Sequence, residues 1–528
     1  MPIKINTICI VGGGFAGWYT AAALRHNFPN IKITVIDSDK HARLGVGETL
    51  GWSAPYDWKK LLGLKDDRML MWRTGAIYKY GLTVHNFWKD NSSYSYGKFH
   101  NVKVNALSKF YGEFDYPEYY EPWSKREGEV GVQQAWMNIR NGNFDDYIAE
   151  LNESSHFVTN PVAPYNVENR YVLRPNDGYS YHIDAEQTVG FLKELSLGDY
   201  CEHVNKTVVD FDNGVILEDN QKVTADLYID ASGFKRVLIN RVNDTWHDLG
   251  DEYNNAAWVC PSSYTDPTKE MCGGTDLYGE DYGWRFKVKL YHRIGNGYIF
   301  NSKIVDPAVP FERLLAVTNN RLVEPRLLGW SPGYYTKTWV DKNVVALGIS
   351  AGFVDPYDAP TFDIHSRALE DLFASLALDD IDSARTQFNR NQTTVVEERN
   401  LRLKYNFGLS QRSGAWWQSR RDMIDMQELE SIINGEHKDI DDRLRYNWYQ
   451  MYYRMCMACN VDRSHFKPIN LSSSDRQMSE AFFNYNRARN QFITEQQWPN
   501  YYEWLKTNRF NGYTSDEIFQ KLNPQWSK

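Results

Sequence analysis

The sequence lacks the features by which several classes of protein are recognised. No apolar run approaches the roughly 18 residues that span a membrane, so we expect neither a membrane segment nor a membrane partner. No long block of like charges is present and the net charge is −9, which argues against an electrostatic grip on nucleic acid. Internal repeats and low-complexity tracts are also absent.

Cysteine is scarce, with six residues scattered over 528. This spacing is no disulfide framework, so we expect a protein of the reducing cytoplasm. Cys456 and Cys459 form one C-x-x-C pair, a spacing found in redox and zinc sites. The pair lies in a helical, aromatic run with no second pair and no paired histidines nearby. This context favours packing, and we predict no metal site.

Aromatic residues, in contrast, are abundant. They make up 15% of the chain, including 18 Trp and 35 Tyr. Part of this excess must serve packing, but it also supplies side chains that bind flat organic rings. At 528 residues the chain can bury a large core and form two or three domains or one large unit.

The strongest local signal is a glycine-rich turn near the start of the chain. The apolar run 5–11 predicts a buried parallel strand, G-x-G-x-x-G spacing follows, and an alanine-rich helix spans 18–28. A second strand, 31–36, ends at Asp37, 20 residues after Gly17, where an acid binds a ribose hydroxyl. This order predicts binding of an adenine dinucleotide, with its pyrophosphate at the helix N-terminus. The predicted binding residues are Gly12, Gly13, Gly14, Phe15, Ala16, Gly17 and Asp37.

The rest of the chain alternates strands and helices up to about residue 364 and is helical thereafter. A helix is predicted from Tyr181 to Leu197. Strands are predicted at residues 68–88, 204–211, 215–218, 226–234, 284–289, 298–305 and 344–349. The pattern indicates an α/β core with long insertions and a helical tail.

Five short blocks follow one another between residues 5 and 420: Gly12–Trp18, Gly45–Glu48, Asp226–Phe234, Gly283–Val288 and Gly348–Pro356. They resemble motifs of the flavin-dependent halogenases, specifically the tryptophan-halogenase branch of the two-component flavin monooxygenases. The block that begins at Gly283 departs from the family's G-W-x-W-x-I-P at two positions, with Phe286 for the second Trp and Lys289 for the Pro. Within the family, the blocks also resemble those of a virus-encoded enzyme of broad substrate range.

This resemblance implies a fold and a reaction. The fold would be a doubly wound, Rossmann-like FAD-binding monooxygenase core with an antiparallel substrate sheet and a helical C-terminal region. The FAD-binding module would span 1–370, with insertions at about 85–180 and 240–330, and an aromatic-rich helical region would span 371–528. The reaction would be halogenation of an electron-rich aromatic substrate, an indole or a phenol, through hypohalous acid. It would use O2, a halide ion and FADH2 that diffuses from a separate flavin reductase.

The resemblance also implies two catalytic residues. Lys79 falls at the active-site lysine of a K-x-G-[IL] motif, and Asp358 falls at the catalytic glutamate. Asp in place of Glu moves the carboxylate by about 1 Å, a misplacement that can cost up to about 100-fold in rate. Judged from the residues alone, Lys79 could be a surface lysine of an alternating strand, and Asp358 an ordinary turn residue.

The halide site departs from the family as well. Ala359, Pro360 and Thr361 replace a Ser-Thr-Gly sequence whose Thr-Gly amides help to hold the halide. Pro360 has no N–H, whereas Thr361 keeps its amide and adds a hydroxyl. We therefore predict weaker use of chloride and a preference for bromide or iodide.

Further contacts are predicted at both ends of the site. An aromatic stripe at helical spacing also occurs in ordinary cores, and the family's tryptophan-binding residues are not recognisable, which favours an open pocket. Further cofactor residues are Gly45, Val46, Gly47, Glu48, Val208, Ile349 and Phe362. Candidate substrate residues are His100, Ala359, Trp416, Trp417 and Trp448.

Two other functions fit part of the pattern. A single-component flavin hydroxylase shares the dinucleotide motif but uses NAD(P)H, and such enzymes usually carry Gly-Asp where this chain has Gly348-Ile349. A non-catalytic protein could keep the same fold as a binding scaffold, with Lys79 and Asp358 incidental. The sequence predicts neither the natural substrate nor the oligomeric state.

Overall fold

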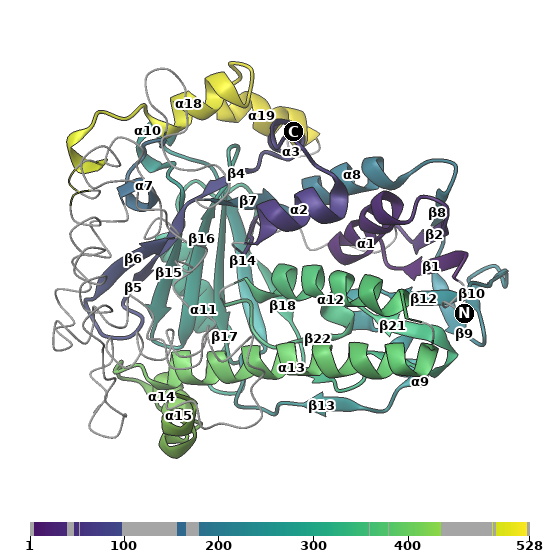
Figure 1. Ribbon diagram of the computed structural model, residues 1–528. Helices are drawn as coiled ribbons and strands as arrows, with labels where there is room; N and C mark the ends of the chain where they lie inside the picture. The colour runs from purple at the N-terminus through teal and green to yellow at the C-terminus, as the bar shows by residue number, and fades with distance from the viewer. Residues whose placement is uncertain are drawn as a thin grey trace, which may run out of the picture.

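The computed structural model describes residues 5–39, 47–51, 53–97, 156–164, 179–357, 359–378, 380–433, 488, 491 and 493–524. Two large sheets stand beside one another, with helices above and below them (Figure 1). Among the described residues, no helix combines the length and apolar character needed to cross a bilayer. Several predicted residues lie outside the described ranges: Gly45, Val46, His100, Asp358, Trp448, Cys456 and Cys459.

The first sheet is the predicted doubly wound core. Its strand order is β20-β21-β12-β1-β2-β8, and all pairs are parallel except β20 with β21. Its strands are β1 (Thr7–Val11), β2 (Lys32–Asp37), β8 (Cys201–Asn205), β12 (Leu227–Asp230), β20 (Trp339–Val340) and β21 (Val344–Ala346). Residues 8–11 of the first strand are apolar and buried because both faces of the sheet are covered.

Each face of this sheet has its own core. Ile8 and Ile10 pack into the cluster that contains helix α1 (Phe15–Asn27) and helix α8 (Ala185–Ser196). Cys9 and Val11 point the other way, into a cluster with the sheet of β9 (Val208–Phe211), β10 (Val215–Leu217) and β11 (Lys222–Val223). The alternation follows from the two-residue period of a strand.

The second sheet has seven strands in the order β18-β14-β17-β16-β15-β5-β6. It is antiparallel, as predicted, except that β15 and β5 are parallel. The predicted strand 298–305 occupies 294–300 instead, because Asn301 begins a turn by accepting from the amide of Lys303 at 2.8 Å. The strands are β5 (Gly81–His85), β6 (Ser93–Gly97), β14 (Ala256–Ser262), β15 (Gly274–Glu280), β16 (Gly283–Lys289), β17 (Ile294–Phe300) and β18 (Arg326–Gly329).

Two small sheets and several short helices complete the α/β part. One small sheet has the order β3-β7-β4 and the other β13-β19-β22. Their strands are β3 (Gly47–Thr49), β4 (Ile77–Lys79), β7 (Ser180–Asp184), β13 (Trp246–Asp248), β19 (Gly333–Tyr335) and β22 (Gly352–Phe353). The helices are α2 (Ala54–Leu62), α3 (Arg68–Thr74), α7 (His156–Thr159), α9 (Ile239–Val242), α10 (Pro267–Glu270) and α11 (Ala308–Val317).

Two local predictions were wrong. Residues 68–74 form α3 rather than the start of a strand, because Leu70, Met71 and Thr74 share one buried helical face. Residues 181–184 belong to β7 rather than to a helix, and α8 begins only at Ala185. Asp184 ends the strand and caps the helix, since its carboxylate accepts from the amides of Glu186 and Gln187.

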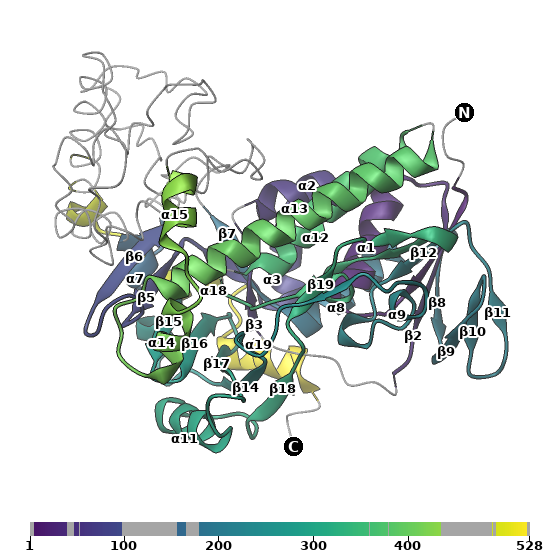
Figure 2. The same cartoon turned by 90° about the horizontal axis from the view of Figure 1, so that it is seen from below.

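The helical region begins with α12 (Pro360–Leu376) and the long α13 (Ile381–Gly408). Figure 2 shows α13 running beside α12 from the seven-stranded sheet to the doubly wound sheet. Phe388 joins the core under α1, and Phe407 joins that of the second sheet, so α13 ties the two together. The predicted boundary after residue 370 stays a prediction and falls inside α12. The remaining helices are α14 (Ala415–Arg421), α15 (Met426–Ile433), α18 (Tyr501–Asn508) and α19 (Ser515–Leu522).

Candidate functional site

The glycine-rich turn has the geometry that a dinucleotide needs. Gly12 has a φ of +114°, and a Cβ there would collide with the carbonyl of Ala231 on the neighbouring strand. A Cβ at Gly17 would collide with the carbonyl of Gly12, so α1 and β1 pack as closely as predicted. Gly14, by contrast, has no atom within 4 Å of its added Cβ. The turn therefore leaves open space beside the free amides of the α1 N-terminus, which fits a pyrophosphate.

Asp37 lies where a ribose-binding acid is expected. It is the last residue of β2, and its carboxylate packs so closely on Gly13 that a Cβ there would collide with Asp37 Oδ2. The residues present therefore fit an adenine dinucleotide such as FAD.

Two further predicted cofactor residues lie against the same turn. The ring of Phe362, in the first turn of α12, contacts the ring of Phe15 edge-to-face at a centroid distance of 4.3 Å. Ile349 follows Gly348, where a Cβ would lie 2.8 Å from the Cβ of Ala16. Val208, in contrast, begins β9 and packs into the cluster on the face of the sheet away from α1.

The N-terminus of α12, where the halide site is predicted, has one backbone donor fewer than an ordinary helix end. Ala359 precedes it with a φ of +51°, and Pro360 is the first helical residue. Pro360 supplies no N–H, whereas the amide of Thr361 has no acceptor within the helix because of its position in the first turn. This end of a 17-residue helix keeps a favourable dipole for an anion while offering fewer amides than usual.

Lys79 is buried and ends β4 in the small sheet. Its side chain is only 4% exposed, and Nζ donates to the carbonyl oxygen of Leu50 at 2.9 Å. Ser180, its partner on β7, donates from Oγ to the same carbonyl at 3.1 Å and to the carbonyl of Gly51 at 2.5 Å. Lys79 is therefore not the solvent-exposed lysine of an ordinary alternating strand.

The turn at Leu50 and Gly51 connects Lys79 to α12. A Cβ at Gly51 would collide with the carboxylate of Asp363, which lies in the first turn of that helix. The Asp363 carboxylate also accepts from Ser53 Oγ at 3.3 Å and lies 3.4 Å from Arg399 Nη2. The fold thus brings together three separate parts of the sequence: strand β4 with Lys79, the turn at Leu50 and Gly51, and the N-terminus of α12.

Charges around this junction are strongly perturbed. Burial, reinforced by the nearby Asp184, raises the pKa of Glu48 on β3 to about 7. Burial, with the positive charges of Lys79 and Lys289, holds the pKa of His182 well below its usual range. His182 therefore stays neutral, between the carbonyl of Lys289 at 2.9 Å and Thr275 Oγ1 at 2.7 Å.

Sequence reasoning missed Ser180, His182 and Asp363. The predicted helix began at Tyr181 and Ser180 ended the preceding insertion, so the pairing of Ser180 with Lys79 could not be anticipated. Asp184 is the signal that could have predicted the strand. It is an N-cap residue followed by Glu186 and Gln187, a pattern that predicts a helix beginning at Ala185.

Trp416 and Trp417, two predicted substrate residues, lie in the core of the second sheet. Both side chains are fully buried. The indole N–H of Trp416 donates to Asn254 Oδ1 at 3.0 Å, and that of Trp417 to the carbonyl of Glu280 at 2.8 Å. A contact of either residue with the substrate stays a prediction.

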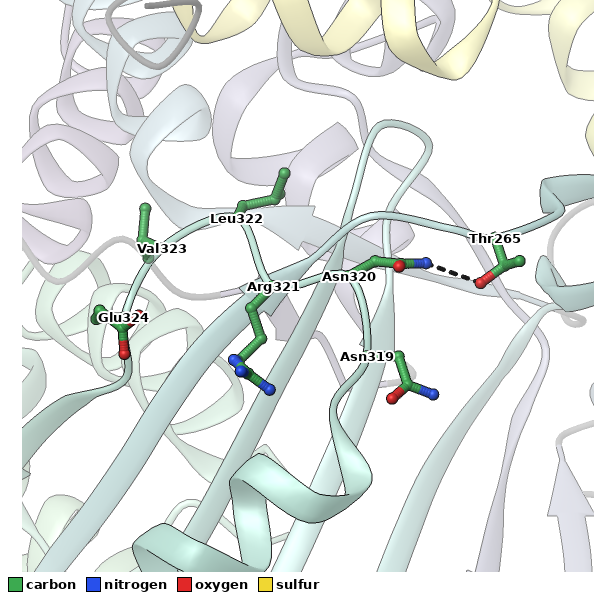
Figure 3. Close-up of a pocket in the computed structure, with 7 residues that line it drawn as sticks. All are labelled: Thr265, Asn319, Asn320, Arg321, Leu322, Val323 and Glu324. Carbon is green, nitrogen blue, oxygen red and sulfur yellow. Dashed lines mark hydrogen bonds between the residues drawn. The ribbon is translucent and has the colours of Figure 1, made fainter.

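A separate hollow of about 770 Å³ contains none of the predicted residues (Figure 3). It is formed by Asn319–Glu324 and Thr265, with Asn320 Nδ2 donating to Thr265 Oγ1 at 2.8 Å. Within the described ranges, no group of three His, Cys, Asp or Glu side chains is arranged to hold a metal ion.

The comparison with known proteins gives one consistent result. The family model described as tryptophan halogenase matches residues 7–459. Tryptophan 7-halogenase RebH of Lentzea aerocolonigenes is 23% identical over 485 residues, covering 86% of this chain and 87% of that protein. Tryptophan 7-halogenase KtzQ of Kutzneria sp. is 24% identical, covering 80% and 79% of the two chains.

Solved structures agree in fold. BrvH, a flavin-dependent halogenase from Brevundimonas sp. BAL3, has a TM-score of 0.75 at 21% identity, covering 96% of this chain and 99% of its own. Tar14, a tryptophan C-6 flavin-dependent halogenase from taromycin biosynthesis, has a TM-score of 0.76 at 20% identity, covering 95% and 99%. The predicted fold class is confirmed.

Proposed function

The chain belongs to the tryptophan halogenase family, and on that premise we propose that it halogenates electron-rich aromatic compounds, both indoles and phenols. It is a flavin-dependent halogenase and thus an oxidoreductase. The observation that carries the proposed site is the burial of Lys79 at the turn that packs on the α12 N-terminus. Reduced FAD, when bound, would supply hypohalous acid from O2 and a halide ion.

The protein's own residues would then direct that acid. The glycine-rich turn with Asp37 would hold the dinucleotide, and Glu48 would lie on the loop beside it. The amide and hydroxyl of Thr361 would hold the halide, with bromide or iodide preferred because Pro360 offers no N–H. The Lys79 amine would hydrogen-bond the hypohalous acid or carry its halogen. Because its surroundings exclude water, the hypohalous acid would not escape to solvent.

Asp358 would complete the site from the segment just before α12. Its carboxylate would stabilise the cationic ring intermediate or accept its proton as a general base. The substrate range would be broad, because the family's dedicated tryptophan-binding residues are not recognisable in the sequence. We propose that FADH2 diffuses from a separate reductase and that the reaction takes place in the cytoplasm; a viral origin stays a prediction.

Mass spectrometry of products tests this function. The purified protein is incubated with a panel of indoles and phenols, chemically reduced FAD, O2 and each of chloride, bromide and iodide. We expect halogenated products that disappear without halide. Hydroxylated products formed with NADPH alone would instead identify a single-component hydroxylase. Failure to bind FAD at all would identify a non-catalytic scaffold.

A further inference from the structure

A buried chain of hydrogen bonds joins α14 to the segment that precedes Asp358. The indole N–H of Trp416 donates to Asn254 Oδ1 at 3.0 Å, and Asn254 Nδ2 donates to Asp355 Oδ2 at 2.7 Å. The other oxygen of Asp355 accepts from the backbone amide of Tyr357 at 2.9 Å. Trp416, Asn254 and Asp355 are each no more than 3% exposed, so water does not substitute for these partners.

The same segment is held on its other sides by aromatic residues. The ring of Tyr357 contacts three others, Phe87, Trp284 and Phe407, at centroid distances of 5.1, 5.5 and 5.2 Å. Trp330 Nε1 donates to the carbonyl of Val354 at 3.2 Å. Residues 354–357 are thus fixed from several elements, one residue before Asp358.

The buried positive charge of Arg420 stabilises the carboxylate of Asp355, the last acceptor in this series of hydrogen bonds. Burial raises the pKa of Asp355 to about 6, opposed by its hydrogen bonds with Asn254 and Tyr357 and by the positive charge of Arg420. The guanidinium of Arg420 lies 5.2 Å from the centroid of the Trp416 ring and is itself buried. Arg420 therefore favours the carboxylate form of Asp355, the form that can accept two hydrogen bonds.

We propose that Trp416 and Asn254 are positioning residues that, through Asp355, fix the backbone of residues 354–357 and so constrain the proposed catalytic acid that follows them in the sequence. This inference rests on the proposed function. It gives Trp416 a role as a hydrogen-bond donor rather than as a wall of the substrate pocket. A loosened segment would leave hypohalous acid formation intact but lower its transfer to the substrate.

The donor and acceptor roles in the hydrogen bonds from Trp416 to Asp355 can be tested by substitution. In Asp355→Asn the side-chain oxygen can still accept from the backbone N–H of Tyr357. The new NH2 group then faces the NH2 of Asn254, and both groups are donors. Rotating the Asn254 amide would offer its oxygen to residue 355 but turn its NH2 toward the indole N–H of Trp416. One donor is therefore unpaired in either arrangement. Trp416→Phe removes that indole N–H, so in the double variant the rotated Asn254 NH2 no longer faces a second donor.

The experiment compares wild type, D355N, W416F and the double variant. The readouts are halogenated product per FADH2 consumed, hypohalous acid captured by a soluble thiol, FAD affinity and thermal unfolding. We expect D355N to lower product per FADH2 by about tenfold, with a matching rise in captured acid and unchanged FAD affinity. The double variant should recover most of that loss.

Trp417→Phe is the matched control, because it removes a neighbouring buried indole N–H that donates to the carbonyl of Glu280. Combined with D355N, it should rescue nothing. The inference is overturned if D355N keeps the wild-type product yield, if W416F fails to rescue it, or if W417F rescues it equally. If wild type halogenates no substrate, the proposed function fails instead. Non-additive unfolding temperatures of D355N and W416F would still report the hydrogen-bond chain.

Discussion

The ammonium nitrogen of Lys79 lies 2.9 Å from the carbonyl oxygen of Leu50, whose neighbour Gly51 packs on the Asp363 carboxylate of α12. A single turn of the chain thus lies between the predicted halogen-carrying amine and the helix that carries the predicted halide site. Because Ser180 Oγ also donates to the carbonyl of Leu50, we expect changes at Lys79 to alter chemistry more than stability.

Replacing Lys79 by Met tests its role. The linear side chain fills nearly the same space, and Leu50 keeps a partner because Ser180 Oγ donates to its carbonyl at 3.1 Å. We expect the free energy of unfolding to fall by only about 1 kcal/mol. Halogenated product, measured by mass spectrometry, should disappear, while FADH2 is still oxidised and hypohalous acid is still released. Lys60→Met, at a half-exposed lysine of α2, is the control and should halogenate as wild type does. Normal product yield from K79M would contradict the proposed site.

Alanine at two glycines of the turn separates folding from cofactor binding. Gly14→Ala meets no protein atom within 4 Å, and its φ of −76° suits alanine, so thermal stability should be unchanged. Its methyl group would occupy the space proposed for the pyrophosphate, and we expect FAD affinity to fall at least about tenfold. Gly17→Ala should instead destabilise the fold, because its Cβ collides with the backbone of Gly12.

Gly190→Ala is the control for both variants, since it has open space on α8 and should be neutral or slightly stabilising. Fluorescence titration with FAD and thermal unfolding provide the measurements. Wild-type FAD affinity in G14A would place the pyrophosphate elsewhere.

Pro360→Ala tests the halide site. Alanine restores the N–H that proline lacks and remains compatible with the first position of a helix. A hydrogen bond to an ion is worth about 1.5 to 3 kcal/mol, so chloride use should rise about tenfold or more relative to bromide. Product ratios in mixtures of chloride, bromide and iodide measure the change. Pro267→Ala, at the corresponding position of α10, restores an amide away from the site and should alter nothing. A clear chloride preference in wild type would refute the predicted role of Pro360.

Glu48→Gln tests the buried charge on β3. The pKa of Glu48 is raised from 4.5 to about 7 by burial, so the folded state binds this proton more tightly than the unfolded chain does. The resulting penalty on stability is absent below pH 4.5, grows as pH rises, and is complete above about pH 7. E48Q removes the ionisation, so the variant should be more stable than wild type by about 1 to 3 kcal/mol at pH 8 and equal to it at pH 4.

Urea unfolding of the cofactor-free protein at the two pH values measures this difference. Glu202→Gln, at an exposed position on β8, is the control and should show no pH-dependent gain. An equal gain for E48Q at both pH values would show that the effect is packing rather than charge.

The sequence by itself determined the features that depend on short-range order. The strand, the glycine-rich turn, the helix and Asp37 follow one another within 37 residues, and inside that unit Gly13 packs on Asp37 and Gly17 on Gly12. The same local logic placed Lys79 on a strand, which the structure confirms with β4. The local pattern predicted a helix at residues 181–184, where helix and strand signals overlap. These residues form a strand because they pair with β3 and β4.

Only the tertiary structure decided which side chains are buried and what they bind. Trp416 pairs with Asn254, 162 residues away, and Lys79 reaches Leu50, 29 residues away. An aromatic stripe has the same sequence pattern whether it lines a pocket or fills a core, and a lysine has the same letter whether it meets water or a carbonyl. Burial and hydrogen-bond partners are properties of contacts between segments that only the folded chain brings together.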